Sequence, residues 1–163
     1  MSRTLRRIGL VLAGAIATGA ILAAGARFHD GPLGPLPGGA LRAGELVPSP
    51  PADWTHVRVG ETVELETRPH APWSVTTWAV VHEGGLYLPA DFLNPIKRWP
   101  VFVLADPEVV LRTGGRRYPL SARRVEDPGL IKALRQAFAA KYGITEGSAS
   151  ARIEVWFFRL EGR

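Results

Sequence analysis

Hydrophobic and polar positions in this chain fall into short segments that glycines join in pairs. Segment 74–82 leads through Glu-Gly-Gly into segment 86–89, and segment 108–113 leads through Gly-Gly into segment 116–126. These segments are rich in β-branched and aromatic residues, which favour strands, and consecutive glycines permit the positive φ angles of a tight turn. The pattern predicts two β-hairpins that both turn on Gly-Gly.

Two further segments complete the predicted sheet. Segment 62–67 alternates between polar and apolar residues, which predicts a strand with Val63 and Leu65 directed inward. Segment 152–160 is apolar on both faces, as is segment 74–82. A strand with two buried faces is typical of a barrel wall that is covered by a helix or by a second subunit, so a homodimer is expected.

The second hairpin has a predicted register. Across its Gly-Gly turn Leu111 faces Tyr118 and Val109 faces Leu120, which gives the hairpin one apolar side. Pro119 has no backbone N–H to donate. Its strand is therefore expected at an edge of the sheet or at a bulge.

A helix is predicted after the second hairpin. Asp127 and Pro128 stand in the order of an N-cap and a first-turn proline, and Gly143 is a typical stop. Between them apolar residues recur at helical spacing, at Leu130, Ile131, Leu134, Phe138 and Tyr142. The segment is expected to be an amphipathic helix that packs on the barrel.

A shorter helix is predicted in the connection between the hairpins. Asn94 and Pro95 have the order of an N-cap and a first-turn proline, and Pro100 is expected to kink or interrupt the helix. The chain thus runs strands, crossover, strands, helix, strand. This order predicts a mainly β (α+β) fold, a small antiparallel barrel with helices at its edge.

The N-terminal segment 1–27 is expected to be membrane-directed. Residues 8–26 are uncharged, and the length of this segment is close to the roughly 20 residues that span a bilayer as a helix. Arg3, Arg6 and Arg7 precede them, so the positive-inside rule places the N-terminus in the cytoplasm. One interpretation is a single-pass anchor in the inner membrane with the following domain in the periplasm. The alternative is a signal peptide cut after Ala26, which releases the domain.

The next segment, 28–53, is dominated by glycine and proline. Prolines at this density prevent regular hydrogen bonding and favour extended chain, so the segment is interpreted as a linker. Its interleaved leucines indicate contact with the domain or with the lipid surface. The folded domain is expected over 54–163, with Trp54 as a packing residue.

Charge and composition exclude several functions. The net charge of +5 comes largely from arginines that flank the apolar segment, and without them sixteen basic residues face fifteen acidic ones. No basic stripe is left to bind nucleic acid. The chain has no cysteine, which excludes disulfides, thiolate metal sites and a cysteine nucleophile. The histidines lack metal-ligand spacing, so no metal site is expected, and only His70 is a candidate for a site.

From about Glu66 to Leu160 the chain resembles the split β-barrel flavin and deazaflavin oxidoreductases around pyridoxamine-phosphate oxidase, and in particular the deazaflavin-dependent nitroreductases. The resemblance depends on six features in chain order. They are a basic turn entering a strand, a glycine hairpin, a basic connection with Trp, a strand, a Gly-Gly turn and a helix. These pieces are 68–77, 83–85, 97–99, 103–109, 113–116 and 127–142. One departure is the turn 66–73, which has prolines where the family has glycines that let the backbone approach the coenzyme phosphate.

The resemblance implies a bound FMN or deazaflavin coenzyme. Cations and hydroxyls would hold its phosphate by charge-assisted hydrogen bonds, and Trp99 and Trp73 would stack on its ring. The expected cofactor-binding residues are Arg68, Ser74, Thr76, Thr77, Lys97, Arg98 and Trp99. In the alternative interpretation the two arginines pair with Glu66 and Asp91 and the tryptophans belong to the core.

Two functions are compatible with this sequence. The first is a membrane-anchored, outward-facing oxidoreductase that reduces a quinone-like or nitro-aromatic small molecule with its flavin-type coenzyme. The second is a non-catalytic module of the same fold that binds a ligand, haem or a partner protein at the membrane surface. The prolines of the turn 66–73 favour the second function, and the basic-aromatic connection 97–99 favours the first.

Overall fold

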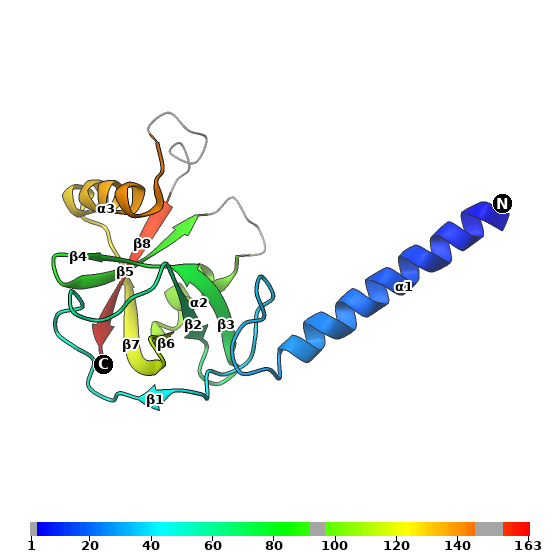
Figure 1. Cartoon of the computed structure of the whole chain (residues 1–163), viewed down its shortest axis with the longest axis horizontal. Helices are drawn as coiled ribbons and strands as arrows, with labels where there is room; N and C mark the ends of the chain where they lie inside the picture. The colour runs from blue at the N-terminus through cyan, green and yellow to red at the C-terminus, as the bar shows by residue number, and fades with distance from the viewer. Residues whose placement is uncertain (1–2, 92–96, 146–154) are drawn as a thin grey trace.

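The structure, a computed structural model, describes residues 3–91, 97–145 and 155–163. A long N-terminal helix leads to a curled sheet that carries two shorter helices (Figure 1). The elements in chain order are α1 (Arg3–Ala26), β1 (Glu45–Leu46), β2 (Thr62–Thr67), β3 (Trp73–Trp78), β4 (Val80–His82), β5 (Gly85–Asp91), α2 (Trp99–Ala105), β6 (Glu108–Thr113), β7 (Arg116–Arg124), α3 (Pro128–Tyr142) and β8 (Val155–Gly162).

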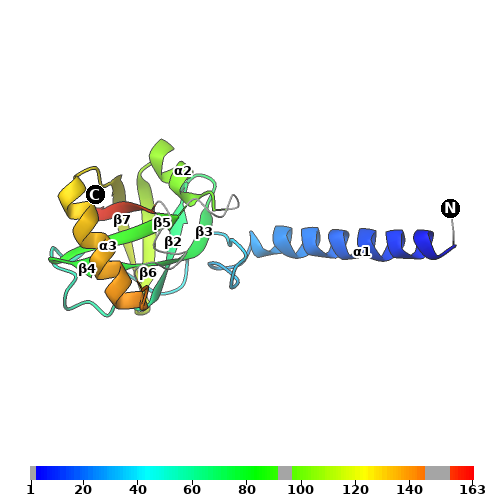
Figure 2. The same ribbon diagram turned by 90° about the horizontal axis from the view of Figure 1, so that it is seen from above.

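The strands form one curled sheet. Its order is β3-β2-β6-β7-β8-β5-β4 with antiparallel neighbours, and the short β1 adds to β7 in parallel. The two ends of this order, β3 and β4, are consecutive in the chain and separated by Ala79 alone. The chain itself therefore joins the two edges of the sheet, which curls into a barrel (Figures 1 and 2). The predicted mainly β antiparallel barrel is confirmed.

The prediction of a single strand over 74–82 is wrong, because the structure divides it at Ala79. The N–H of Ala79 donates to the Tyr142 hydroxyl at 3.1 Å, and its carbonyl accepts from Lys141 Nζ at 2.7 Å. These two residues end α3, so the helix satisfies the backbone groups that a neighbouring strand would otherwise satisfy. β3 can then pair with β2 while β4 pairs with β5.

The second hairpin has the predicted turn and register. Gly114 and Gly115 have φ angles of 57° and 76°, as a two-residue turn of this kind requires. Pro119 lies at a local edge, because β1 pairs with β7 only at Arg116 and Arg117 and β8 pairs with it from Leu120 onward. The facing pairs are those expected, Leu111 with Tyr118 and Val109 with Leu120.

The first hairpin turns one position earlier than predicted. Its turn residues are Glu83 and Gly84, with φ angles of 48° and 75°, and Gly85 already pairs within β5. Gly85 serves packing instead, since a Cβ there would lie 2.8 Å from the Tyr87 ring. The expectation that this hairpin turns on Gly-Gly is therefore wrong.

Two buried clusters hold the fold together. One fills the barrel and includes Val63, Leu65 and Trp54, which are directed inward as predicted, together with Phe158. The other lies between the sheet and α3 and includes Phe157. Consecutive residues of a strand point to opposite faces, so β8 supplies both clusters. Residues 152–154, which the sequence also assigns to this strand, lie outside the described residues.

Helix α3 has the predicted ends. The Asp127 side chain accepts the Leu130 N–H at 2.6 Å, which caps the helix, and Gly143 has φ 64° at its C-terminus. Leu134 and Phe138 are buried against the sheet. This face of the helix covers the second apolar side of the strands, as the sequence pattern predicts.

Helix α2 begins later than the pattern indicates. Its first residue is Trp99 with Arg98 at the N-cap, and Pro100 occupies the first turn. Proline fits there because a first-turn N–H has no partner within the helix. The expected kink at Pro100 is therefore wrong. The proposed start at Asn94 and Pro95 lies outside the described residues.

Residues 27–47, here called the strap, lie along the barrel. The Arg27 guanidinium donates to the carbonyl of Gly38 at 2.5 Å and to that of Pro72, and it lies 4.4 Å from the centre of the Trp73 ring. Gly38 and Ser74 exchange backbone hydrogen bonds of 2.9 and 3.1 Å. The strap thereby covers the free edge of β3.

Asp30 of the strap and Glu66 of β2 make two further contacts between the strap and the barrel. Asp30 accepts from Arg112 of β6 at 2.9 Å, and Glu64 of β2 accepts from the same guanidinium. Burial acts to raise the pKa of Asp30, but hydrogen bonds from the Arg42 N–H, from Arg112 and from the Ala43 N–H outweigh it and lower this pKa. The buried Glu66 accepts the Leu41 N–H at 2.6 Å, and desolvation raises its pKa.

The glycines of the strap allow close backbone approach. A Cβ on Gly38 would overlap the Gly31 carbonyl, and a Cβ on Gly39 would overlap the Arg27 carbonyl. A Cβ on Gly31 would overlap the Arg112 side chain, and Gly31 also has φ 83°. Glycine composition here reflects tight packing as well as chain flexibility.

Helix α1 extends away from the barrel (Figures 1 and 2), and Ala26 at its end is buried. Residues Arg6–Ala26 have a mean hydropathy of 2.1 and the length needed to cross a membrane. A signal sequence has the same properties, so both interpretations of the N-terminus stay open.

Candidate functional site

A polar groove runs along the outer side of β2 and β3. It consists of two cavities of about 290 and 500 Å³ that share Thr62 and Thr76. The smaller one is completed by Thr77, Trp78, Pro89 and Lys97, and the larger one by Arg58, Gly60, Val63, Glu64, Arg112, Thr113, Gly114 and Gly115. Together they have the size of a ligand site.

Strand register places the groove residues together. Thr62 pairs with Trp78 and Glu64 pairs with Thr76 across β2 and β3. Directly opposite residues of paired strands point to the same face, so hydroxyl, carboxylate and indole groups gather there. Thr77, the next residue along β3, is buried at the inner edge of the smaller cavity.

An aromatic wall closes one end of the groove. Trp78 is 46% exposed and stacks on Tyr142 of α3 with ring centroids 5.0 Å apart and planes at 27°. Phe138 supports both rings from below, at 5.4 and 4.8 Å. The indole therefore has a fixed orientation while it stays accessible, as a stacking surface requires.

A lysine and two threonines line the cavity beside this wall. Lys97, Thr76 and Thr77 line the same small cavity, although Lys97 is some twenty residues away along the chain. An ammonium with neighbouring hydroxyls can hold a phosphate through charge-assisted hydrogen bonds. The structure thus brings together one cation and two hydroxyls from the set that the sequence singles out.

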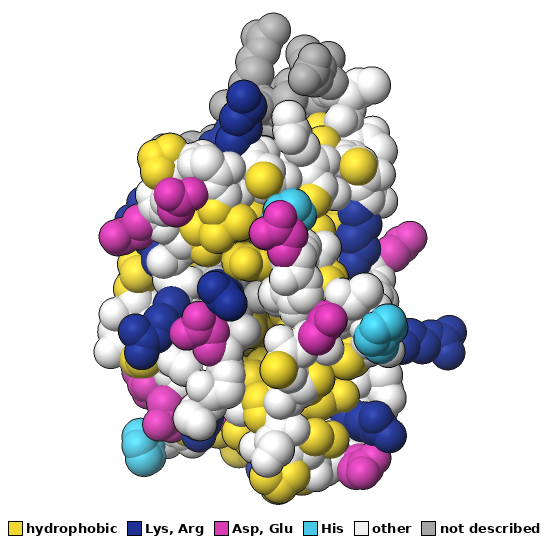
Figure 3. All heavy atoms as spheres, turned by 90° about the vertical axis from the view of Figure 1, so that its left-hand side faces the viewer, with side chains coloured by type: hydrophobic (Ala, Val, Ile, Leu, Met, Phe, Trp, Pro, Cys, Tyr) yellow, Lys and Arg dark blue, Asp and Glu magenta, His cyan; other side chains and the backbone are white. Residues whose placement is uncertain are grey.

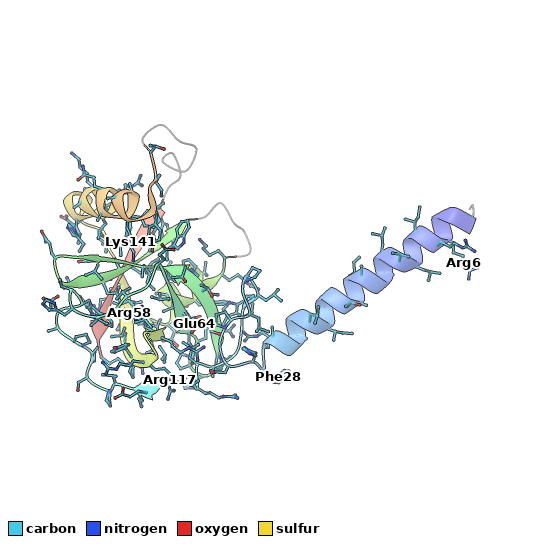
Figure 4. All side chains as sticks on the ribbon, in the orientation of Figure 1. Arg6, Phe28, Arg58, Glu64, Arg117 and Lys141 are labelled. Carbon is cyan, nitrogen blue, oxygen red and sulfur yellow. The ribbon has the colours of Figure 1, made fainter. Side chains whose placement is uncertain are left out.

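Charged residues form the other end of the groove, and two of them, Glu64 and Arg112, are paired with each other. Arg112 is engaged by Glu64 and Asp30, and hydrogen bonding to Glu64 raises its pKa against the opposing effect of burial. The Arg58 carbonyl accepts from the Thr113 hydroxyl at 3.4 Å, and residue Arg58 is exposed. In Figure 4 Arg58 and Glu64 lie between Lys141 at the end of α3 and Arg117 of β7.

Lys141 and Tyr142 form the rim that joins the groove to α3. The Lys141 ammonium donates to the carbonyls of Gly60 and Ala79 at 3.0 and 2.7 Å. Desolvation lowers the pKa of Lys141 and raises the pKa of Tyr142. Both side chains form hydrogen bonds with backbone groups, and these bonds fix the end of α3 against the barrel.

Arg68 and Arg98 lie elsewhere, around Phe102 of α2. Their guanidinium carbons are 4.8 and 5.8 Å from the centre of its ring. Arg68 lines a separate cavity of about 250 Å³ together with His70 and Phe102. Arg68 also has φ 58°, an uncommon backbone conformation for a residue with a side chain.

The remaining predicted residues are buried. Ser74 is fully covered beneath the strap, and Trp99 is 1% exposed and packs edge-on against Phe158 at 5.2 Å. Trp73 is half-buried between Arg27 and Phe102. Neither Trp73 nor Trp99 lines the groove, whereas the exposed Trp78 does. Trp78 could have been identified as a groove residue from its cross-strand pairing with Thr62. That pairing is known only once the register of β2 and β3 is known.

Among the described residues no group of three or more His, Asp or Glu side chains could hold a metal ion. The described histidines are scattered, with His70 at the Arg68 cavity and His82 at the end of β4. The smaller cavity is lined by a lysine, by threonines and by an indole, which are groups able to bind an anion and to stack on a flat ring.

No protein-family model matches this chain, and no curated protein matches it. Solved structures do match. A conserved hypothetical protein from Mycobacterium tuberculosis has a TM-score of 0.51 at 18% identity, covering 66% of this chain and 76% of that one. An F420-H2 dependent reductase has a TM-score of 0.50 at 17% identity, covering 66% and 99%. A domain-swapped dimer has a TM-score of 0.52 at 19% identity, covering 68% and 87%. At this identity the likeness shows the fold, which is the split barrel of these proteins.

Proposed function

We propose that this chain, which has the split-barrel fold of flavin- and deazaflavin-dependent oxidoreductases, binds a phosphate-bearing coenzyme of that class in the groove over β2 and β3. The observation that carries the proposal is the position of Lys97, Thr76 and Thr77 in one cavity beside the exposed ring of Trp78. The proposed reaction is the reduction of a quinone-like or nitro-aromatic small molecule at the membrane surface.

The groove residues fit such a coenzyme. Lys97 and the threonine hydroxyls would hold the phosphate, and Trp78 would stack on the flat ring system. The two cavities, which share Thr62 and Thr76, are together large enough for an extended molecule. When bound, the coenzyme supplies hydride transfer, and the protein supplies orientation and exclusion of water. This chain shares its fold with an F420-H2 dependent reductase, which supports the use of a deazaflavin coenzyme, beside FMN, in binding experiments.

A second candidate function is a non-catalytic binding module. In the family that the sequence resembles, the turn before β3 binds coenzyme phosphate. Here the Pro72 carbonyl of that turn accepts a hydrogen bond from Arg27, and the strap covers Ser74. This turn therefore contacts the strap at the place where the family binds the coenzyme phosphate, which favours the binding module.

The absorption spectrum of the detergent-purified full chain tests the choice. A bound flavin or deazaflavin gives its visible bands, and haem gives a Soret band. If the purified chain is colourless and takes up neither FMN nor a deazaflavin, the oxidoreductase proposal is abandoned in favour of the binding module.

Lys97→Ala is expected to weaken coenzyme binding about 10- to 100-fold, because a hydrogen bond to a charged group contributes about 1.5–3 kcal/mol. The measurement is a fluorescence titration of the full chain in detergent with FMN and with a deazaflavin coenzyme. The matched control is Arg68→Ala, which removes a cation from the separate cavity and is expected to leave the affinity unchanged. The reverse outcome would move the phosphate site to the Arg68 cavity.

We also propose that α1 stays attached as a single-pass anchor. Ala26, after which the alternative cleavage would occur, is 2% exposed, and Arg27 is bound to Gly38 and Pro72. In the folded chain this position is therefore not accessible to a peptidase, which needs an extended and exposed segment. The intact mass of membrane-extracted protein is expected to include residues up to Ala26. A mature N-terminus at Arg27 would establish the secreted alternative.

A homodimer is part of the same proposal. One of the solved structures with this fold is described as a domain-swapped dimer, which supports testing the oligomeric state. The measurement is sedimentation of the detergent-solubilised chain.

A further inference from the structure

The end of α1 is fastened to the barrel without a flexible spacer. Arg27 is the first residue after α1, and its guanidinium bonds to Gly38 and lies 4.4 Å from the centre of the Trp73 ring. If α1 spans a membrane, as proposed above, the barrel must therefore stand directly on the lipid surface. The question is which of its faces meets the lipid.

A row of aromatic rings and guanidinium groups leads from that point to α2. The Trp73 and Phe102 rings lie 5.7 Å apart, edge to face. Arg68 and Arg98 reach the Phe102 ring from a different turn and from the N-cap of α2. Arg27, Arg68 and Arg98 thus gather around two neighbouring rings, Trp73 and Phe102, beside the end of α1 that joins the barrel.

Exposed apolar side chains accompany these cations. Phe28, which follows Arg27, is 84% exposed, and Val101 and Leu104 of α2 are 59% and 53% exposed. In Figure 4 Phe28 lies at the junction of α1 and the barrel. Large apolar side chains interleaved with arginines are typical of surfaces that lie in the headgroup region of a bilayer.

The charges of this face suit an anionic partner. Within the described ranges no salt bridge involves Arg27, Arg68 or Arg98, whereas Arg112, Arg116 and Arg123 elsewhere are all paired with acids. The one acid that lines the Arg68 cavity, Asp106, accepts the Glu108 N–H at 3.1 Å. By contrast, the face turned away from α1 shows basic and acidic side chains interspersed around apolar ones (Figure 3).

The backbone of Arg68 adds an independent observation. Its φ of 58° is held by the turn in which the Ala71 N–H donates to the Arg68 carbonyl at 2.8 Å. A non-glycine residue in the left-handed region is strained, and such strain is concentrated at functional positions. The guanidinium of this residue lies 4.8 Å from the centre of the Phe102 ring.

We infer that the face formed by Arg68, Arg98, Phe102, Val101 and Leu104 docks on the anionic headgroups of the leaflet from which α1 emerges. The inference rests on the proposed membrane span. Anionic lipids attract basic side chains within a Debye length of the surface, so docking should weaken as salt rises. The barrel would then have one fixed orientation on the membrane, with the groove of β2 and β3 accessible at its side.

The absence of cysteine permits a direct test with single spin labels. Leu104→Cys places a nitroxide on the exposed side of α2, and Gln136→Cys places a matched one on the exposed side of α3, which lies on the far side of the barrel from α1 (Figures 1 and 2). The full chain is reconstituted into nanodiscs of phosphatidylcholine, with and without phosphatidylglycerol. Collision with oxygen and with a water-soluble nickel chelate then reports the depth of each label.

In discs with phosphatidylglycerol the oxygen-to-nickel ratio at position 104 is expected to be several-fold higher than at position 136. High salt, or Arg68→Gln combined with Arg98→Gln, should reduce that difference. Equal ratios at the two positions in discs that retain the protein would overturn the docking but leave the span intact. Loss of the chain from the discs would overturn the span and the docking with it. Shielding of position 104 that rises with protein concentration in detergent would assign this face to a second copy and would also overturn the inference.

Discussion

Arg112→Ala is expected to lower the free energy of unfolding of the barrel by about 3 kcal/mol, because breaking a largely buried charge pair leaves its partners uncompensated. The Arg112 side chain is 15% exposed and joins Asp30 of the strap to Glu64 of β2. Its removal would leave both carboxylates facing each other without a cation. Urea unfolding of the full chain in detergent, followed by near-ultraviolet circular dichroism, measures the change.

Arg116→Ala is the matched control. Arg116 belongs to the same hairpin and pairs with Glu45 at 3.1 Å, but both side chains are more than half exposed. Solvent screens such a pair, so its loss should change stability by no more than about 1 kcal/mol. Equal effects of the two substitutions would show that the strap is not held by Arg112. A double-mutant cycle with Asp30→Asn then isolates the strap contact from the Glu64 contact.

Trp99→Ala is expected to destabilise the fold by roughly 3–5 kcal/mol, the cost of deleting a large aromatic side chain from a core. Trp99 is 1% exposed and packs against Phe158 inside the barrel. Its indole N–H has no hydrogen-bond partner among the described residues, so Trp99→Phe removes a buried polar group while keeping an aromatic ring. The phenylalanine variant should therefore retain most of the stability.

Coenzyme titration separates a core role from a stacking role at this position. If Trp99 belongs to the core, Trp99→Phe binds coenzyme as the natural chain does, and Trp78→Ala loses affinity because the exposed ring is removed. A loss of affinity in Trp99→Phe at unchanged stability would return Trp99 to the cofactor site. The Trp78→Ala variant retains the Tyr142 and Phe138 rings that support it, so its effect reports mainly the missing stack.

The strap changes how a glycine- and proline-rich segment is understood in this chain. Composition alone indicates an extended linker, because prolines prevent ladders and glycines add freedom. In the structure Gly38 and Gly39 allow carbonyl groups to approach closely, and the leucine at position 41 is 3% exposed. The same residues therefore serve packing once they lie against β3. The connection between α1 and the domain is thereby fastened to the barrel by hydrogen bonds, on which the inference about lipid docking depends.

Local patterns were sufficient for the elements whose physics is local. The Gly114–Gly115 turn, the pairing of Leu111 with Tyr118 and the Asp127 cap of α3 follow from neighbouring residues, and each was predictable. The chain order of strands and helices also determined the barrel class, since antiparallel strands with short connections leave few arrangements.

The position of each candidate side chain was decided by tertiary contacts. Ala79 is a break because Lys141 and Tyr142, some sixty residues later, hydrogen-bond to it, and no local pattern contains that information. Lys97 lines one cavity with Thr76 and Thr77, while Arg68 and Arg98 gather on Phe102 instead. The sequence by itself determined which elements form, because hydrogen bonding and periodicity act between near neighbours. Only the folded sheet decided which cations share a cavity, because curvature and strand order bring together residues that are distant along the chain.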